Sequence, residues 1–230
     1  MGVSSEARPW FPFDDRDDAG LRLARKMVSL RRSPDTVVLA LARGGVPVGQ
    51  AVASALALPW DVMVVRKLGV PGSPETAFGA LARYGALTAA VHLPATMEYL
   101  RRNGYDPAEL EQVDTAERAE LARRQALYVT EPQPAVAGRT ILLCDDGAAT
   151  GATLQAAVGL LREQRAGTIH VCVPAAPART CSELAELADK MTCLQPWPTM
   201  HSVSEAYLRF DQLDDARVMA ALAGRATPGT

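Results

Sequence analysis

The sequence predicts an α/β fold built on a doubly wound, mainly parallel sheet. Short apolar runs rich in β-branched residues alternate with amphipathic helical runs along most of the 230 residues. Because a helix between two strands makes a crossover connection, this alternation indicates parallel strands. Turns rich in small residues follow the apolar runs at 37–42 and 141–144. Ligands bind beyond the carboxyl ends of such strands, so we expect the functional site there.

Composition favours one domain, or a domain with a subdomain, and argues against several classes of function. The chain is 48% apolar, which is enough for a substantial core. Its 24 basic and 26 acidic residues give a formal net charge of −2, so the surface as a whole does not favour nucleic acid. The first residues contain no apolar signal core, and no run approaches a membrane-spanning length. We therefore expect a soluble cytoplasmic protein that binds neither nucleic acid nor membrane.

The cysteines and histidines do not predict a transition-metal site. The four cysteines have no CxxC spacing and lie mostly in apolar runs, which favours buried thiols. The three histidines are scattered, and none makes a metal-ligand pattern with a cysteine or a second histidine.

The N-terminal segment predicts a helix followed by the first strand. Prolines and aromatic residues at 9–13 favour an extended segment packed on the body of the protein. Four acids surround Arg16 at residues 14–18, and acids complement the positive end of a helix dipole. This charge run therefore reads as the solvated start of a helix over about 17–31, which precedes the strand at 37–42.

A basic pair and a turn-rich loop follow the next strand. After a helix predicted over 48–58, the apolar run at 61–65 predicts a strand that ends in Arg66 and Lys67. A diphosphate would be a fitting counter-charge for this pair. The following loop at 68–75 contains two glycines and two prolines, so we expect it to be irregular and able to move as a lid.

The remaining elements continue the alternation. Broken apolar stretches at 78–92 predict a hairpin at the sheet margin, and helical runs at 94–102 and 107–128 predict an exposed insertion. A connector over 130–138 precedes the strand at 141–144. The later elements are a helix over 154–165, a strand over 168–173, a helix over 178–190, a strand over 191–194, an irregular segment to residue 215, a helix over 216–222 and frayed residues 226–230.

The most informative stretch is residues 141–153, which read as a buried strand, two carboxylates and a small-residue turn into a helix. The helix start aims unpaired backbone N–H groups at the turn, which suits a phosphate, and Thr150 and Thr153 add hydroxyl donors. Asp145 and Asp146 suit sugar hydroxyls or a hydrated cation.

A second turn, Arg43-Gly44-Gly45, follows the strand at 37–42. Its adjacent glycines let the backbone approach a ligand closely and expose N–H groups toward an anion. The two turns together therefore predict one site for a phosphorylated ligand.

Residues 141–153 closely resemble the phosphoribosyl-pyrophosphate (PRPP) binding motif of the type I phosphoribosyltransferases. The order Ala-Arg-Gly-Gly-Val-Pro, then Val-Arg-Lys-Leu-Gly-Val-Pro-Gly-Ser-Pro-Glu, resembles a less characterised bacterial branch of that family over roughly residues 14–194. The branch usually has a proline at Ala42, an acid near Arg83, and a glycine and a tryptophan close to Ser204 and Ala206. These departures lie away from the phosphate loops, so they leave PRPP binding intact and the acceptor open.

The resemblance implies one domain over 1–230 with a Rossmann-like core, a hood subdomain and a helical insertion. The core would cover about 14–77 and 139–194, with the hood and insertion at about 78–138 and 195–225. It also implies a homodimer and a mobile loop near 68–75 that closes over PRPP.

The resemblance and the chemistry of PRPP together give a role to each loop. Asp145 and Asp146 would hold the ribose hydroxyls, with Mg²⁺ held mainly by the diphosphate and only indirectly by these acids. Arg66 and Lys67 would support the leaving charge, which makes them catalytic residues together with the acid pair. Pyrophosphate would bind at Arg43, Gly44, Gly45 and Lys67. The 5′-phosphate would bind at Ala148, Ala149, Thr150, Gly151, Ala152 and Thr153. Residues possible on the acceptor side are Glu75, Tyr207 and Asp211.

Two functions from different classes fit these features. The first is an enzyme that transfers ribose 5-phosphate from PRPP to a nitrogen heterocycle or another small nucleophile. The second is a PRPP or nucleotide sensor that does not catalyse, because a motif retained for binding need not support turnover. The basic pair and the expected lid favour the enzyme, since a sensor has less need of leaving-group charges.

Overall fold

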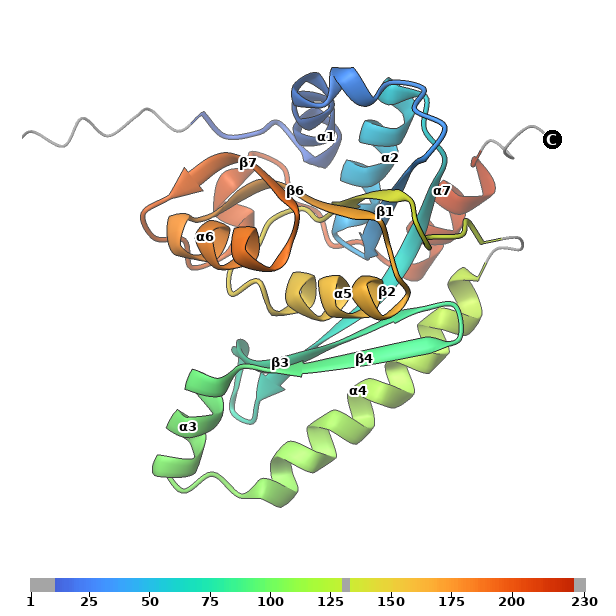
Figure 1. Ribbon diagram of the computed structural model, residues 1–230. Helices are drawn as coiled ribbons and strands as arrows, with labels where there is room; N and C mark the ends of the chain where they lie inside the picture. The colour runs from blue at the N-terminus through green and yellow to red at the C-terminus, as the bar shows by residue number, and fades with distance from the viewer. Residues whose placement is uncertain (1–10, 130–132, 226–230) are drawn as a thin grey trace, which may run out of the picture.

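The computed structural model describes residues 11–129 and 133–225, apart from the side chains of Pro74 and Glu75. Its centre is a seven-stranded sheet in the order β4-β3-β2-β1-β5-β6-β7 (Figure 1). The five strands from β2 to β7 in this order are parallel, and β3 and β4 add an antiparallel edge. The strands are Thr36–Ala42 (β1), Trp60–Val70 (β2), Ser73–Tyr84 (β3), Leu87–His92 (β4), Thr140–Cys144 (β5), Thr168–Pro177 (β6) and Lys190–Trp197 (β7).

Helices cover both faces of the sheet, which confirms the predicted doubly wound α/β fold. Alternate residues of β1 point to opposite faces. Val38 and Ala40 join a core with α1, α2, α4 and α7, whereas Leu39 and Leu41 join a core with α5 and α6. The helices are Arg16–Lys26 (α1), Gly45–Leu56 (α2), Pro94–Arg102 (α3), Pro107–Tyr128 (α4), Ala152–Glu163 (α5), Ala178–Leu187 (α6) and Asp215–Ala223 (α7), with short 3₁₀ helices at Val28–Leu30 (η1) and Val203–Ala206 (η2).

The neighbouring strands β1 and β5 mark the point where the strand order reverses. The chain leaves β1 through α2 toward β2, and it leaves β5 through α5 toward β6 on the other side. Open α/β sheets bind ligands at such a switch point, in the crevice beyond the carboxyl ends of the strands. The topology therefore places the two turns singled out in the sequence next to each other.

The expectation of an irregular loop over 68–75 is wrong. Strand β2 continues to Val70, and β3 begins at Ser73, so only a two-residue turn at Pro71 and Gly72 separates them. Arg66 and Lys67 consequently lie within a strand and not at its end. Antiparallel pairing with β3 extends β2, and register shifts on either side of Gly69 accommodate the irregular sequence.

Other boundaries shift where tertiary pairing extends a strand or ends a helix early. The predicted helix over 17–31 ends at Lys26 and gives way to η1, whereas α2 starts at Gly45, earlier than predicted. Strands β6 and β7 are longer than predicted because they pair along their length. The hairpin at 78–92 and the helices α3 and α4 are confirmed. Predictions for residues 9–10, 130–132 and 226–230 lie outside the described part of the chain.

The insertion is less exposed than predicted. The last two turns of α4 pack against β2 and β3, where Leu121, Arg124, Gln125 and Tyr128 are buried (Figure 1). Among the described residues, no helix has both the length and the apolar character needed to cross a bilayer.

Candidate active site

The two acids lie together at the end of β5. Because the strand ends at Cys144, the chain is already turning at Asp145, and both carboxylates are buried with 9% of each residue exposed. The backbone N–H of Asp146 donates to Oδ1 of Asp145 at 2.9 Å. Burial raises the pKa of both carboxyls, and the charge of Asp146 raises the pKa of Asp145 further.

The glycine turn after β1 approaches the acid pair as closely as the backbone allows. A Cβ atom on Gly44 would lie 2.3 Å from Oδ2 of Asp146, and one on Gly45 would lie 2.7 Å from the carbonyl oxygen of Cys144. Gly44 has helical dihedral angles with φ −56°, so the requirement for glycine is one of space and not of backbone conformation. The two turns therefore form one continuous wall.

The small-residue turn leads directly into α5. Gly151 has φ +73°, a left-handed conformation that glycine adopts readily, and Ala152 begins the helix. Residues 147–153 line a cavity of about 270 Å³ together with Lys67, His201 and Ser202. This cavity includes every residue predicted to hold the 5′-phosphate. His201 and Ser202, from the segment after β7, carried no signal in the sequence.

The basic pair of β2 is divided between two cavities because consecutive strand residues face opposite ways. Lys67 lines the cavity of the 147–153 turn, whereas Arg66 lines a neighbouring cavity of about 370 Å³ that contains Arg43 and Gly44. Asp145 and Asp146 border both cavities. The sequence predicts Lys67 together with Arg43, Gly44 and Gly45, but the structure places Arg66 in the cavity of Arg43 and Gly44 and Lys67 in the cavity of residues 147–153.

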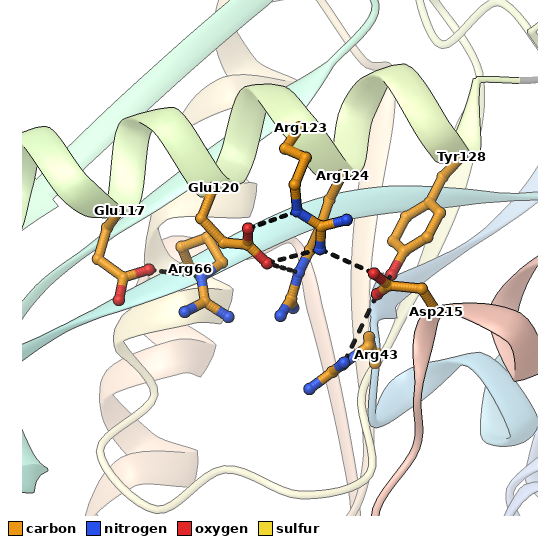
Figure 2. A network of polar contacts seen from close by, with 8 residues as sticks. All are labelled: Arg43, Arg66, Glu117, Glu120, Arg123, Arg124, Tyr128 and Asp215. Atoms are coloured by element: carbon orange, nitrogen blue, oxygen red, sulfur yellow. Dashed lines mark hydrogen bonds and ion pairs between the residues drawn. The ribbon is translucent and has the colours of Figure 1, made fainter.

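A polar network links the cations of the larger cavity to the insertion and to the C-terminal helix (Figure 2). Glu117 of α4 pairs with Arg66 at 2.5 Å, and Asp215 of α7 pairs with Arg43 at 3.5 Å. Glu120 pairs with both Arg123 and Arg124. Only tertiary packing brings these residues to the site, so no local motif in the sequence identifies them.

Arg16 is a further site residue that the sequence motifs do not identify. Its Nε donates to Oδ2 of Asp146 at 2.8 Å, and its Nη1 donates to the carbonyl oxygen of Asp211 at 2.9 Å. The guanidinium lies 3.7 Å from the centroid of the Phe210 ring, in the range of a cation–π contact. The prediction of a solvated helix start is wrong for Arg16, which is only 9% exposed. The feature of the sequence that could have identified Arg16 is its position as the one cation among the four acids of residues 14–18.

The three acceptor-side candidates have different environments. The Tyr207 hydroxyl donates to the carbonyl oxygen of Asp146, and its ring packs against Phe13 and Phe210. Tyr207 therefore supports the backbone at Asp146. Burial, with the nearby charge of Asp146, raises the pKa of Tyr207. Asp211 lines the larger cavity, and the side chain of Glu75 lies outside the described residues.

The acid pair fits Mg²⁺ only in the indirect manner expected for a cation bound with its substrate. Oδ2 of Asp146 is occupied by Arg16, and Oδ1 of Asp145 accepts a backbone N–H. Across residues 11–129 and 133–225, no group of three or more His, Cys, Asp or Glu side chains is arranged to hold a metal. Mg²⁺ commonly uses one or two carboxylates plus phosphate oxygens and waters, so these donors suit a cation held mainly by a diphosphate.

Comparison with known proteins agrees with this geometry. The sequence matches the phosphoribosyl transferase domain family over residues 17–207. Two curated relatives from Mycobacterium tuberculosis, described provisionally as phosphoribosyl transferases, are 37% identical over 211 residues, covering 91% of this chain and 46% of theirs. The chain thus spans about half the length of these relatives. The crystal structure of TT1426 from Thermus thermophilus has a TM-score of 0.71 and 32% identity, covering 94% of this chain and all of that one. The chain therefore belongs to the phosphoribosyl transferase domain family.

Proposed function

We propose that the protein transfers ribose 5-phosphate from PRPP to a small acceptor, such as a nitrogen heterocycle, and releases pyrophosphate. One observation carries the proposal. At the switch point of the sheet, the buried acid pair touches a glycine turn that leaves no room for a side chain, and a phosphate-suited helix start lies beside it. The two carboxylates can accept hydrogen bonds from hydroxyl groups and lie between two turns suited to anions. This arrangement matches PRPP, whose ribose lies between the 5′-phosphate and the diphosphate.

The chemistry requires positioning and charge support more than a covalent nucleophile. The bond from C1 of the ribose to pyrophosphate breaks, and the acceptor forms the new bond to C1 as positive charge develops on the sugar. In the proposal Asp145 and Asp146 orient the ribose hydroxyls, while Arg43 and Arg66 stabilise the departing diphosphate. Mg²⁺ bound with the diphosphate would neutralise part of its charge.

Calorimetric titration with PRPP in the presence of magnesium tests the donor assignment. Wild type should bind PRPP, and Asp145→Asn/Asp146→Asn should bind at least about 10-fold more weakly, because each lost charged hydrogen bond removes about 1.5–3 kcal/mol. Glu109→Gln/Glu111→Gln removes the same two charges from exposed positions of α4 and should bind like wild type. Equal affinity of wild type and the aspartate double variant would overturn the assignment.

Pyrophosphate release distinguishes the enzyme from a sensor. Wild type is mixed with PRPP, magnesium and a panel of purines, pyrimidines and aromatic acids, and the released pyrophosphate is measured. Release that depends on one acceptor supports the transferase and identifies its acceptor. Tight PRPP binding without release for any acceptor would support the sensor. The homodimer expected from the resemblance stays a prediction.

A further inference from the structure

We propose that Arg124, on the insertion helix α4, binds the diphosphate group of PRPP and the pyrophosphate that is released from it. The inference rests on the proposed function and adds a binding residue from an element outside the two turns. It makes α4 part of the active site and not only a cover for the sheet.

The position of Arg124 is the first argument. It lies in the buried last turns of α4, packed over β2, and it is only 6% exposed. Its side chain lines the same cavity of about 370 Å³ as Arg43, Arg66 and the acid pair. Figure 2 shows Arg124 extending from the helix toward the side on which Arg43 and Arg66 lie.

The distribution of charge is the second argument. On the side formed by α4, β2 and the β1 turn, three guanidinium groups line the cavity, those of Arg43, Arg66 and Arg124, whereas their carboxylate partners Glu117, Glu120 and Asp215 are not among the lining residues (Figure 2). The facing wall carries Asp145 and Asp146. A cavity with acids on one side and a cationic excess on the other fits a ligand that has hydroxyl groups at one end and a diphosphate at the other.

The pairing of Arg124 is the third argument. A buried guanidinium requires good partners, because desolvation of its charge is unfavourable. Glu120 accepts from Arg124 at 2.7 Å, but the same carboxylate also accepts from Arg123 at 2.6 Å. Arg124 therefore shares its carboxylate partner, and a guanidinium has five N–H donors, so it can also donate to a phosphate oxygen.

Arg123 provides a matched control. It lies on the same helix, pairs with the same Glu120, and differs from Arg124 in pointing to the surface, with 48% of its side chain exposed. It does not line the cavity. The variants Arg124→Gln and Arg123→Gln thus remove equal charge from one helix, and only the first changes the cavity wall.

The experiment compares three ligands by calorimetry, each with magnesium, on the full chain: PRPP, pyrophosphate and ribose 5-phosphate. Arg124→Gln should weaken binding of PRPP and pyrophosphate by about 10- to 100-fold, the factor for a charged hydrogen bond. Its affinity for ribose 5-phosphate, which lacks the diphosphate, should stay within about twofold of wild type. Arg123→Gln should bind all three ligands within about threefold of wild type.

Each other outcome overturns the inference in a distinguishable way. If wild type binds PRPP and both variants bind it equally well, Arg124 is not a ligand and the proposed function still holds. If Arg124→Gln loses all three ligands alike, its role is structural. If wild type binds neither PRPP nor pyrophosphate, the proposed function fails and the inference fails with it. Should Arg124→Gln not fold, Arg124→Lys keeps the charge and loses the planar fork. It should bind pyrophosphate at least about threefold more weakly, and unchanged affinity would overturn the inference.

Discussion

Two buried aspartate–arginine pairs lie at opposite ends of the sheet. At the start of β2, Asp61 is fully buried, and Arg225 contacts it at 2.9 Å. The hydroxyl of Tyr84 and the amide of Gln133 also donate to Asp61, at 3.3 and 3.4 Å. These partners join β2, β3, the segment before β5 and the end of α7. This carboxylate is enclosed by donors, and its role is to hold the elements together.

The second pair, Arg16 and Asp146, lies at the carboxyl ends of the strands. Its ion-pair distance is similar to that of Arg225 and Asp61, but its surroundings differ. Arg16 contacts Asp146 at 2.8 Å, but a second carboxylate, Asp145, lies beside it, and both border open cavities. Two adjacent buried acids lower the stability of a fold, and such a cost is typical of sites kept for function. Under the proposed function, the pair at Asp61 serves stability and the pair at Asp146 serves binding, so substitutions at the two ends should have opposite consequences.

The largest effect on activity should come from filling the space beside Asp146. In Gly44→Ala the new Cβ would lie 2.3 Å from a carboxylate that Arg16 holds in place. We expect kcat/KM for PRPP to fall by at least about 100-fold, or about 2.7 kcal/mol of transition-state stabilisation. The control Gly159→Ala, on α5, meets no atom within 4 Å and should retain activity. Activity of Gly44→Ala near that of wild type would contradict the close contact of the two turns.

A substitution at Asp61, at the opposite end of the sheet, should lower the free energy of unfolding. Burial raises the pKa of Asp61, but Asp61→Asn also leaves the charge of Arg225 without its carboxylate, and breaking such a pair costs about 3–5 kcal/mol. Urea unfolding should show this loss, while the folded variant keeps its affinity for PRPP. If Asp61→Asn is as stable as wild type, the pair of Asp61 and Arg225 does not serve stability, and the contrast with Asp146 is wrong.

Asp145→Asn should increase the stability of the ligand-free protein by about 1 kcal/mol while weakening PRPP binding. Folding raises the pKa of Asp145 above its ordinary value of 3.8, so the stability that its protonated form contributes at low pH is lost as the pH rises through the folded-state pKa. The amide has no such titration. Unfolding with EDTA at a series of pH values should therefore show the advantage of the variant growing above about pH 4. An advantage that is largest in acid would contradict the assignment.

The smallest effect concerns the network between α4 and α7. The Tyr128 hydroxyl and Arg123 lower the pKa of Asp215 to about 2, so its contribution to stability is present above its ordinary pKa and is lost as the pH falls toward 2. Because the network is partly exposed, we expect less than about 1 kcal/mol. Carbon-detected NMR titration of Asp215 should give a midpoint well below 3.8, and Tyr128→Phe should raise it. A midpoint unchanged by Tyr128→Phe would exclude the hydroxyl as the cause.

The sequence predicts the fold and one wall of the site, because both depend on local patterns. Strand, turn and helix follow one another within residues 141–153, and the backbone of the turn forms the wall directly. The other wall also contains Arg16 of α1, Arg124 of α4 and the segment 210–213 before α7. The contact between Arg16 and Asp146 joins residues 130 positions apart, so only the packed structure reveals it. The length of β2 is unpredictable for the same reason, since its second half depends on pairing with β3.

The pairing of strand β2 determines how firmly Arg66 and Lys67 are held. Its first part is anchored in the parallel sheet by β1 through Val64, its residues 65–68 pair with the part of β3 that also pairs with β4, and only its last two residues extend with β3 beyond β4. Arg66 and Lys67 lie among residues 65–68, and the turn at 71–72 follows Val70. The pairing on both sides of β3 therefore supports the two cations, whereas the turn at 71–72 lies beyond the pairing with β4. A change in the length or sequence of that turn should consequently leave the two cations, one lining each cavity, in place.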